Sequence, residues 1–203
     1  MSKVTCDVST SVDGFVAGPN QSRQDPLGVG GERLHHWMFP AQGQDQAVIE
    51  AWTADAGAYV MGRNMFAPGR GPWDPDWRGW WGDDPPYHVP VFVLTHHPRP
   101  PLEMAGGTTF NFVTDGAAAA LEQARRAAGE KSVLIAGGAN TINQYLAAGV
   151  VDELHLHISP VLLGAGARLF EGVRGLDLQP DQVIASPDVT HVRYQVRRAD
   201  QQD

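Results

Sequence analysis

A short apolar run that leads through two glycines into a helical pattern constrains the fold of this chain more than any other feature. Val133–Ala136 predicts a buried strand, and Asn140-Thr141 opens an amphipathic helix that ends at Gly149. The Gly137-Gly138 turn between them allows close backbone approach, and the helix N-terminus presents unpaired N–H groups and the positive end of its dipole. Such a turn can bind a phosphate or pyrophosphate, although strand–glycine–helix turns also occur without a ligand.

Two earlier apolar runs also end in polar or glycine-rich residues. Ala58–Met61 is followed by Gly62-Arg63-Asn64, and Val91–Leu94 is followed by Thr95-His96. Because the carboxyl ends of parallel strands lie at one edge of an α/β sheet, these exits predict an anion site at that edge. The arginine suits a phosphate, but it could equally be a structural residue that pairs with a carboxylate.

The length and charge of the chain narrow the possible functions. Its 203 residues predict a single domain over residues 1–203. The net charge of −8 and the lack of a basic stripe argue against a nucleic-acid-binding surface, whereas an anionic cofactor needs only a locally positive pocket. One cysteine, Cys6, excludes an intrachain disulfide framework. With no signal peptide and no long apolar run, a cytoplasmic location is the default expectation.

The first predicted strand, Lys3–Thr10, is followed by a turn at Asp13-Gly14. The carboxylate of Asp13 can stabilise this turn, because aspartate commonly bonds to nearby backbone amides. It can also lie at the mouth of a site beside the polar, glycine-rich loop that follows. Both interpretations stay open on the sequence alone.

Residues 67–90 combine prolines, glycines and aspartates with four of the six tryptophans: Trp73, Trp77, Trp80 and Trp81. Linkers rarely carry so much aromatic surface, so we expect an ordered loop that packs on the body or lines a pocket. Trp80 and Trp81 are candidate substrate-binding residues. A structural or interface role has equal support.

A polar row alternates with apolar residues in the predicted strand Val151–Ser159. Glu153, His155 and His157 share one face of that strand, which is a possible metal-ligand arrangement. Because no complementary ligand cluster is evident, we expect a hydrogen-bonded polar face or a subunit contact, and no metal. A metal-binding protein that uses this row is kept as an alternative.

Three further local predictions concern helix caps and a hairpin. Asp45 is predicted to cap a helix that runs to Gly57, with Val48, Trp52 and Ala56 inward. Asp115 is predicted to cap an alanine-rich helix over residues 116–128. The strands at 183–186 and 189–197 are predicted to form a β-hairpin.

The segment Ile158–Phe170, ISPVLLGAGARLF, is one of three that together resemble a known family. With Val133–Asn140 and Met61-Gly62-Arg63, it resembles the C-terminal reductase domain of the bifunctional riboflavin-biosynthesis deaminase/reductase, over about residues 3–197. The resemblance implies an α/β fold of the dihydrofolate reductase-like type: a three-layer sandwich with a central mostly parallel sheet and an antiparallel C-terminal pair. It also implies NADPH as hydride donor and a homodimer.

The resemblance assigns site residues by position. Those near the cofactor phosphates or the pyrophosphate and nicotinamide would be Gly62, Arg63, Asn64, Gly137, Gly138, Ala139, Asn140 and Thr141. Thr95 and His96 would approach the adenosine ribose and its 2′-phosphate, and Asp13 would border the nicotinamide as candidate proton donor, with an ordered water as the alternative donor. Met65 departs from the family pattern, which has a hydroxyl residue there.

The resemblance therefore implies an NADPH-dependent reductase that transfers a hydride to a small heterocyclic substrate, such as a ribosylamino-pyrimidine or a pterin. Hydride transfer requires a positioned cofactor, an electrophilic carbon and a proton, and little else from side chains. A non-catalytic nucleotide-binding protein of the same fold is the alternative from a different class. The metal-binding protein described above is the third.

Overall fold

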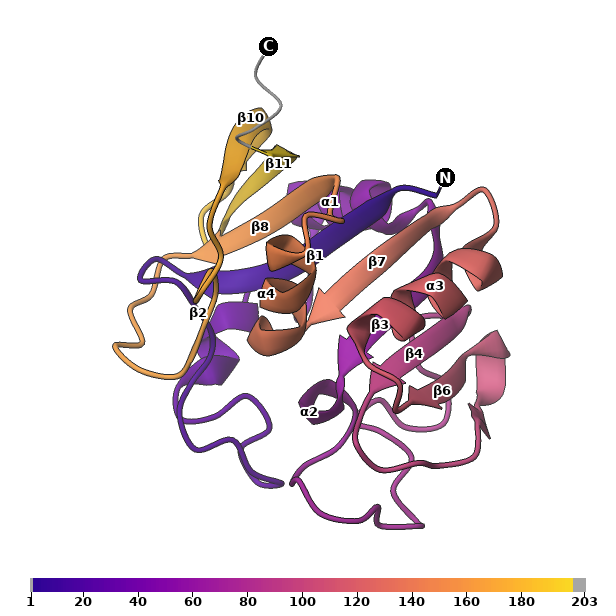
Figure 1. Ribbon diagram of the computed structural model, residues 1–203. Helices are drawn as coiled ribbons and strands as arrows, with labels where there is room; N and C mark the ends of the chain where they lie inside the picture. Colours follow the sequence, from indigo (N-terminus) through magenta and orange to yellow (C-terminus); the bar gives the residue numbers. More distant parts are fainter. Residues whose placement is uncertain (1, 199–203) are drawn as a thin grey trace.

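The apolar runs of the sequence form the strands of one large sheet in the computed structural model, which describes residues 2–198 (Figure 1). Its order is β10-β11-β8-β1-β7-β3-β4-β6-β5. The central strands are parallel: β1 (Val4–Ser11), β3 (Ala56–Gly62), β4 (Pro90–Leu94), β6 (Thr109–Val113), β7 (Ser132–Gly137) and β8 (Glu153–Ser159). Three further strands are each antiparallel to the strands they pair with: β5 (Leu102–Glu103), which pairs with β6, and β10 (Leu176–Ala185) and β11 (Thr190–Arg198), which pair with each other, β11 also pairing with β8. The predicted mostly parallel sheet with an antiparallel C-terminal pair is confirmed.

Helices lie on both faces of this sheet, as predicted (Figure 1). Helices α3 (Ala117–Ala128) and α4 (Ala139–Ala147) cover one face, and α1 (Gly43–Thr53) covers the other. Short elements complete the chain: α2 (Arg63–Phe66), the 3₁₀ turns η1 (Gly31–His35) and η2 (Ala105–Gly107), and the two-stranded pair of β2 (Phe15–Ala17) and β9 (Ala167–Arg168). No helix in the described part of the chain is long and apolar enough to cross a bilayer.

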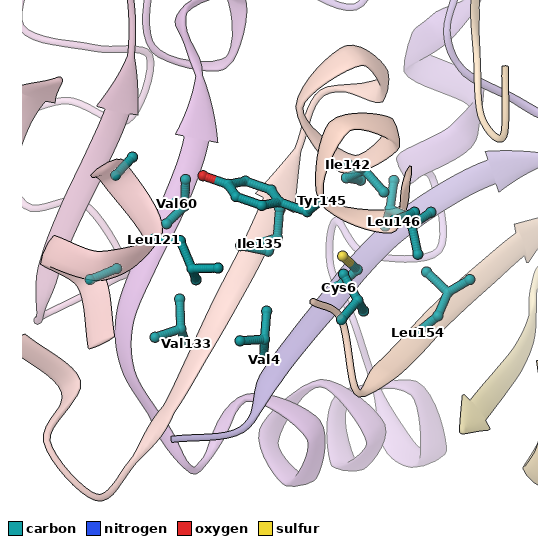
Figure 2. Packing of buried hydrophobic residues seen from close by; sticks show 14 of the residues in the cluster. Val4, Cys6, Val60, Leu121, Val133, Ile135, Ile142, Tyr145, Leu146 and Leu154 are labelled. Atoms are coloured by element: carbon teal, nitrogen blue, oxygen red, sulfur yellow. The ribbon is translucent and has the colours of Figure 1, made fainter. Parts of the chain in front are cut away.

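The main core lies between the sheet and helices α3 and α4 (Figure 2). Alternate residues of the strands, such as Cys6 and Ile135, meet Ile142 and Leu146 of α4, and all four are fully buried. The hydroxyl of Tyr145 donates to the carbonyl of Ala117 at 2.8 Å, which joins the two helices. The core therefore fixes α4 on the strands that flank it.

A second apolar cluster lies under the tryptophan-rich loop. Met61, Phe66, Val91 and Phe110 are buried there, and Trp73, Trp77 and Trp81 are among the partly buried residues packed against them. The ring centroids of Phe66 and Phe110 lie 4.9 Å apart in an edge-on arrangement. The prediction that residues 67–90 form an ordered loop packed on the body is confirmed.

Several local predictions were wrong. Helix α1 begins at Gly43, its N-cap Gln42 makes no side-chain capping bond, and Ala56 belongs to β3. The N-cap of α3 is Gly116 instead of Asp115, and β10 begins at Leu176, well before residue 183. Asp45 does not cap the helix, because its carboxylate is hydrogen-bonded to His191 of β11 instead.

Truncation of the α4 core contact tests this packing. Ile142→Ala removes a fully buried side chain and should lower the free energy of unfolding by about 2–5 kcal/mol. Val183→Ala is the matched control, because Val183 is 62% exposed and surface truncations usually change stability by less than about 0.5 kcal/mol. Urea denaturation measures both, and equal losses in the two variants would contradict the assigned core.

Candidate functional site

The strand register brings the three predicted exits to one level at the carboxyl edge of the sheet. Gly62 pairs with Leu94 across β3 and β4, and Met61 pairs with Gly137 across β3 and β7. The residues that follow these strands are therefore neighbours in space, although the paired strand ends lie 32 residues (Gly62 and Leu94) and 76 residues (Met61 and Gly137) apart in the sequence. The predicted convergence of the exits is confirmed.

The exit of β3 touches the first turn of α4. A Cβ atom on Gly62 would lie 2.5 Å from Oγ1 of Thr141 and 3.6 Å from the backbone nitrogen of Gly138. Real Cβ atoms do not approach so closely, so only glycine allows α4 to sit against β3 here. The contact positions the N-terminus of α4 at the end of β3, where α2 begins with Arg63.

The turn into α4 is open on its outer side. Gly138 is the N-cap, no side chain caps the helix, and a Cβ on Gly138 would meet nothing within 4 Å. Gly137 has a φ of 125° and a cis peptide bond to Gly138, and a Cβ there would approach Sδ of Met65 to 3.0 Å. Met65 thus lies against the turn at Gly137, whereas the space beside the Cα of Gly138 is open.

Arg63 is the principal cation of this edge. Its guanidinium lies 3.9 Å from the ring centroid of Trp73, in cation–π contact. The Nε and Nη1 atoms are buried, and neither has a hydrogen-bond partner within residues 2–198. Burial lowers the pKa of Arg63. The alternative of an arginine paired with a carboxylate is not what the described residues show.

The exit of β4 is joined to the same cluster through the tryptophan-rich loop. Nε1 of Trp73 donates to the carbonyl of His97 at 2.7 Å. The hydroxyl of Thr95 accepts from the backbone N–H of His97 at 3.1 Å, so Thr95 shapes the turn from a buried position. His96 is exposed and is the side chain of this turn that a ligand can reach.

The side chains next to Gly62 and to the Gly137-Gly138 turn differ in how far a ligand could reach them. Asn64 is exposed on α2. Oδ1 of Asn140 accepts from Nε2 of Gln144 at 2.8 Å, so that side chain faces along its own helix. Ala139 and Thr141 are buried and contribute mainly backbone to the helix N-terminus.

Asp13 lies at another turn, where it holds a loop. Its two carboxylate oxygens accept from the backbone N–H groups of Leu163 and Gly164 at 3.1 and 2.7 Å. The hydrogen bond from the Ser11 hydroxyl, together with these amides, lowers the pKa of Asp13 to about 2. At neutral pH the group is an ionised acceptor whose contacts give it a loop-positioning role, and its part as catalytic proton donor stays a prediction.

The two candidate tryptophans of the substrate site have different surroundings. Trp81 stacks on Phe110 with ring centroids 6.2 Å apart and meets Tyr87 edge-on, which is a packing role. Trp80 contacts the Trp77 ring at 4.6 Å and is partly exposed. Both tryptophans are partly exposed, and their contact with a substrate stays a prediction.

The face of the sheet under α1 carries a polar layer that the sequence only partly predicted. Glu153, His155 and His157 lie there as expected, all buried and hydrogen-bonded, so the predicted polar face is confirmed. Within residues 2–198, no group of three His, Cys, Asp or Glu side chains is arranged to hold a metal ion. Asp7, Asp45 and His191 also belong to this layer, and the sequence did not predict their part in it.

Comparison with known proteins identifies the family. The model of the RibD C-terminal domain matches residues 2–192, so the chain belongs to that family. None of the curated proteins compared with the chain matches it. The dihydrofolate reductase-like fold expected from the resemblance is confirmed by solved structures of this family.

Three solved structures illustrate the likeness. A protein ascribed to riboflavin biosynthesis from Shewanella sp. PV-4 is 24% identical with a TM-score of 0.65, over 98% of this chain and 100% of that one. A pyrimidine reductase-like protein from Corynebacterium diphtheriae is 16% identical with a TM-score of 0.59, over 97% and 92%. The Thermotoga maritima deaminase/5-amino-6-(5-phosphoribosylamino)uracil reductase is 14% identical with a TM-score of 0.58, over 96% and 56%.

The loop-positioning role of Asp13 predicts an acid titration. Because the pKa falls from 3.8 unfolded to about 2 folded, the contact stabilises the protein fully above pH 3.8 and is lost as the pH falls through about 2. The NMR chemical shift of the Gly164 amide should titrate near the lower value, and Asp13→Asn should abolish that titration. A midpoint near 3.8 would contradict the assigned contact.

Proposed function

We propose that this member of the RibD C-terminal domain family is an NADPH-dependent reductase that transfers a hydride to a small heterocyclic substrate, of the ribosylamino-pyrimidine or pterin class. The family is one of reductases, and the solved relatives include a riboflavin biosynthesis reductase of Saccharomyces cerevisiae. The names of these relatives support the reaction class that we propose for this chain, the reduction of a substrate by hydride transfer. The identities of 14–24% leave the substrate itself a matter for experiment.

One observation carries the proposal: Arg63, which follows Gly62 at the end of β3, has buried N–H groups without partners within residues 2–198, and Gly62 itself contacts the open first turn of α4. A buried guanidinium without an acceptor is costly, and a phosphate oxygen supplies an acceptor of matching geometry. The helix dipole adds a second favourable contribution for negative charge at the same place. The residues present therefore fit the phosphates of a dinucleotide.

The remaining assignments follow from position on this edge. Gly62, Arg63 and Asn64 hold phosphate oxygens, and the turn from Gly137 to Thr141 holds the pyrophosphate and borders the nicotinamide. Thr95 and His96 lie past β4, where an exposed imidazole suits the ribose 2′-phosphate and favours NADPH over NADH. NADPH, when bound, supplies the hydride.

The protein's own contribution is orientation and exclusion of water. The core contacts of α4 fix its N-terminus, and Trp73 holds Arg63 in place from the loop side. Asp13 anchors the loop at Leu163 and Gly164, which carries the SPVLLGAGARLF motif past the outer side of α4. A second copy of the chain is the partner that we propose, as a homodimer.

Substitution of Arg63 tests the cofactor site. Arg63→Gln removes charge-assisted hydrogen bonds and should weaken NADPH binding about 10- to 100-fold, as measured by isothermal titration calorimetry. Arg126→Gln is the control, because Arg126 pairs with Glu122 on the exposed side of α3. If the wild-type protein binds neither NADPH nor NADH at millimolar concentration, the reductase proposal fails.

The non-catalytic alternative is distinguished by turnover. A reductase should oxidise NADPH in the presence of 5-amino-6-(5-phosphoribosylamino)uracil or a related pyrimidine, which the absorbance of the reduced nicotinamide follows. Tight NADPH binding with no oxidation across such a substrate panel would favour a nucleotide-binding protein of the same fold.

A further inference from the structure

Two buried histidines and two partly exposed aspartates between the sheet and α1 form a continuous chain of hydrogen bonds, which we call the histidine chain: Asp7, His157, His191 and Asp45. Nε2 of His157 lies 3.1 Å from Oδ1 of Asp7, and Nε2 of His191 lies 3.0 Å from Oδ1 of Asp45. The two Nδ1 atoms lie 2.6 Å apart. The chain links β1, β8, β11 and α1 on the face opposite the main core.

The three contacts require three hydrogens. Each carboxylate accepts a hydrogen from an Nε2 atom, and two Nδ1 atoms at 2.6 Å need one hydrogen between them. Two neutral imidazoles supply only two hydrogens. The chain as it stands therefore holds one additional proton, which makes one of the two rings an imidazolium when both carboxylates are ionised.

Burial and charge shift the pKa values of the groups around the two rings. Burial lowers the pKa of His191 most strongly, the hydrogen bond to Asp45 acts in the opposite direction, and the charge of His157 lowers it again. Burial alone would raise the pKa of Asp7, but the charge of His157 and hydrogen bonds from His155 and His157 bring it below its usual range. Burial and the charge of His157 also lower the pKa of His35 to about 4.

The rings are closed off from solvent, whereas the carboxylates are not. Trp37 and Trp52 cover both imidazoles with ring centroids 4.8 to 6.0 Å away, and His191 is fully buried. The side chains of Asp7 and Asp45 are 18% and 16% exposed. Protons thus enter or leave the chain at its carboxylate ends.

Within residues 2–198, the Asp7 end of the chain has an unsatisfied polar neighbour, Ser9. Ser9 lies two residues further along β1 on the same face, and its hydroxyl is buried with no hydrogen-bond partner in the described residues. The charge of Asp7 contributes to the raised pKa of Tyr59, after burial, so that ring is also close. An unpartnered buried hydroxyl next to a partly exposed carboxylate is an incomplete polar site.

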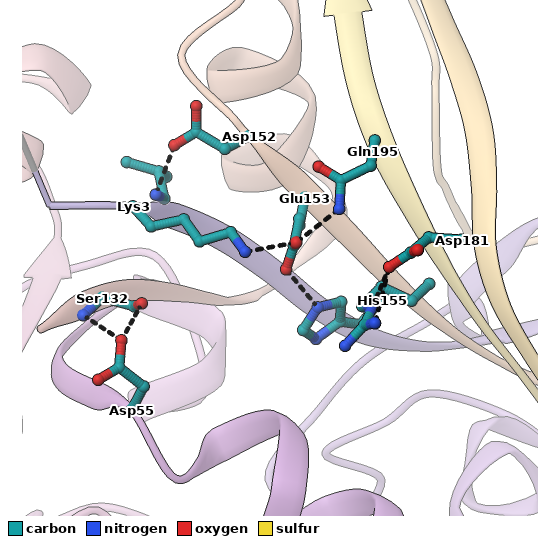
Figure 3. Close-up of polar contacts among 10 residues, drawn as sticks. Lys3, Asp55, Ser132, Asp152, Glu153, His155, Asp181 and Gln195 are labelled. Atoms are coloured by element: carbon teal, nitrogen blue, oxygen red, sulfur yellow. Dashed lines mark hydrogen bonds and ion pairs between the residues drawn. The ribbon is translucent and has the colours of Figure 1, made fainter.

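Other charged or titratable groups border the histidine chain on every side. His155 lies 3.4 Å from Asp7 and 3.3 Å from Glu153, which Lys3 and Gln195 also bind (Figure 3). The remaining neighbours are Tyr59 on β3, Arg193 on β11 and His35 on η1. Glu153 is neutralised by Lys3, so the two carboxylates of the histidine chain rely on the imidazolium.

We propose that the histidine chain is the proton store of the reductase and that Asp7 is the residue that hands the proton to substrate; this inference rests on the proposed function. As the hydride adds to the electrophilic carbon, the proton on Nε2 of His157 passes to Asp7 and from there to the substrate nitrogen or oxygen that gains the electron pair. His157 is left neutral. After product leaves, a solvent proton returns through Asp7.

The proton store is tested first without any ligand, by NMR of ¹⁵N-histidine protein. One imidazole should carry protons on both nitrogens at pH 7, and that signal should vanish in His157→Gln. His88→Gln is the control, because His88 is exposed in the loop before β4, next to Gly106. Neutral rings throughout at pH 7 in the wild-type protein would overturn the proposal.

Delivery through Asp7 is tested by steady-state kinetics with NADPH and 5-amino-6-(5-phosphoribosylamino)uracil. Asp7→Asn should lower kcat about 100-fold and remove the alkaline limb of its pH profile, with KM and NADPH affinity unchanged. Asp7→Glu should restore part of kcat, and unchanged NADPH affinity shows that the variants fold. Wild-type kcat and pH profile in Asp7→Asn would overturn the delivery step.

The two proposals fail in different ways. A wild-type protein that binds no NADPH overturns the proposed function and the delivery step together, whereas the NMR result still decides whether the proton store exists. If the protein binds and oxidises NADPH but shows only neutral histidines, the proposed function stands and the proton-store proposal is overturned.

Discussion

The close contact between Gly62 and the first turn of α4 is the constraint on which the candidate site depends. With no Cβ in the way, Thr141 sits directly on the end of β3, the strand that Arg63 follows. The strand register then brings the exits of β4 and β7 to the same edge. Three separate pieces of chain thus share one electrostatic environment, in which backbone N–H groups and a buried guanidinium both favour an anion.

The opposite face of the same strands has a different chemistry. Alternation places Cys6 and Val8 in the apolar core and Asp7 and Ser9 under α1, so one strand serves both layers. Polar groups at this depth are tolerated only when paired, and the two histidines neutralise and join carboxylates from distant elements. A reductase site can therefore use two parts of the sheet: the carboxyl edge for the anionic cofactor, and this polar layer for the proton.

The sequence predicted what local patterns determine. The strand exits at Gly62 and Gly137 were recognised because a short apolar run followed by glycine depends on neighbouring residues alone. The stacking of Trp73 on Arg63 was not, since it depends on the path of an irregular loop. Asp45 was misread as a helix cap because its partner, His191, lies 146 residues away. The polar side of β1 was a usable signal for the histidine chain, but the pairing itself is tertiary.

The most direct measurement of the central claim is a crystal structure with NADP⁺ bound. The account predicts the pyrophosphate at the N–H groups that begin α4, with a phosphate oxygen against Nε or Nη1 of Arg63 and the nicotinamide beside the Gly137-Gly138 turn. A dinucleotide bound elsewhere, with Arg63 still lacking an acceptor, would contradict it.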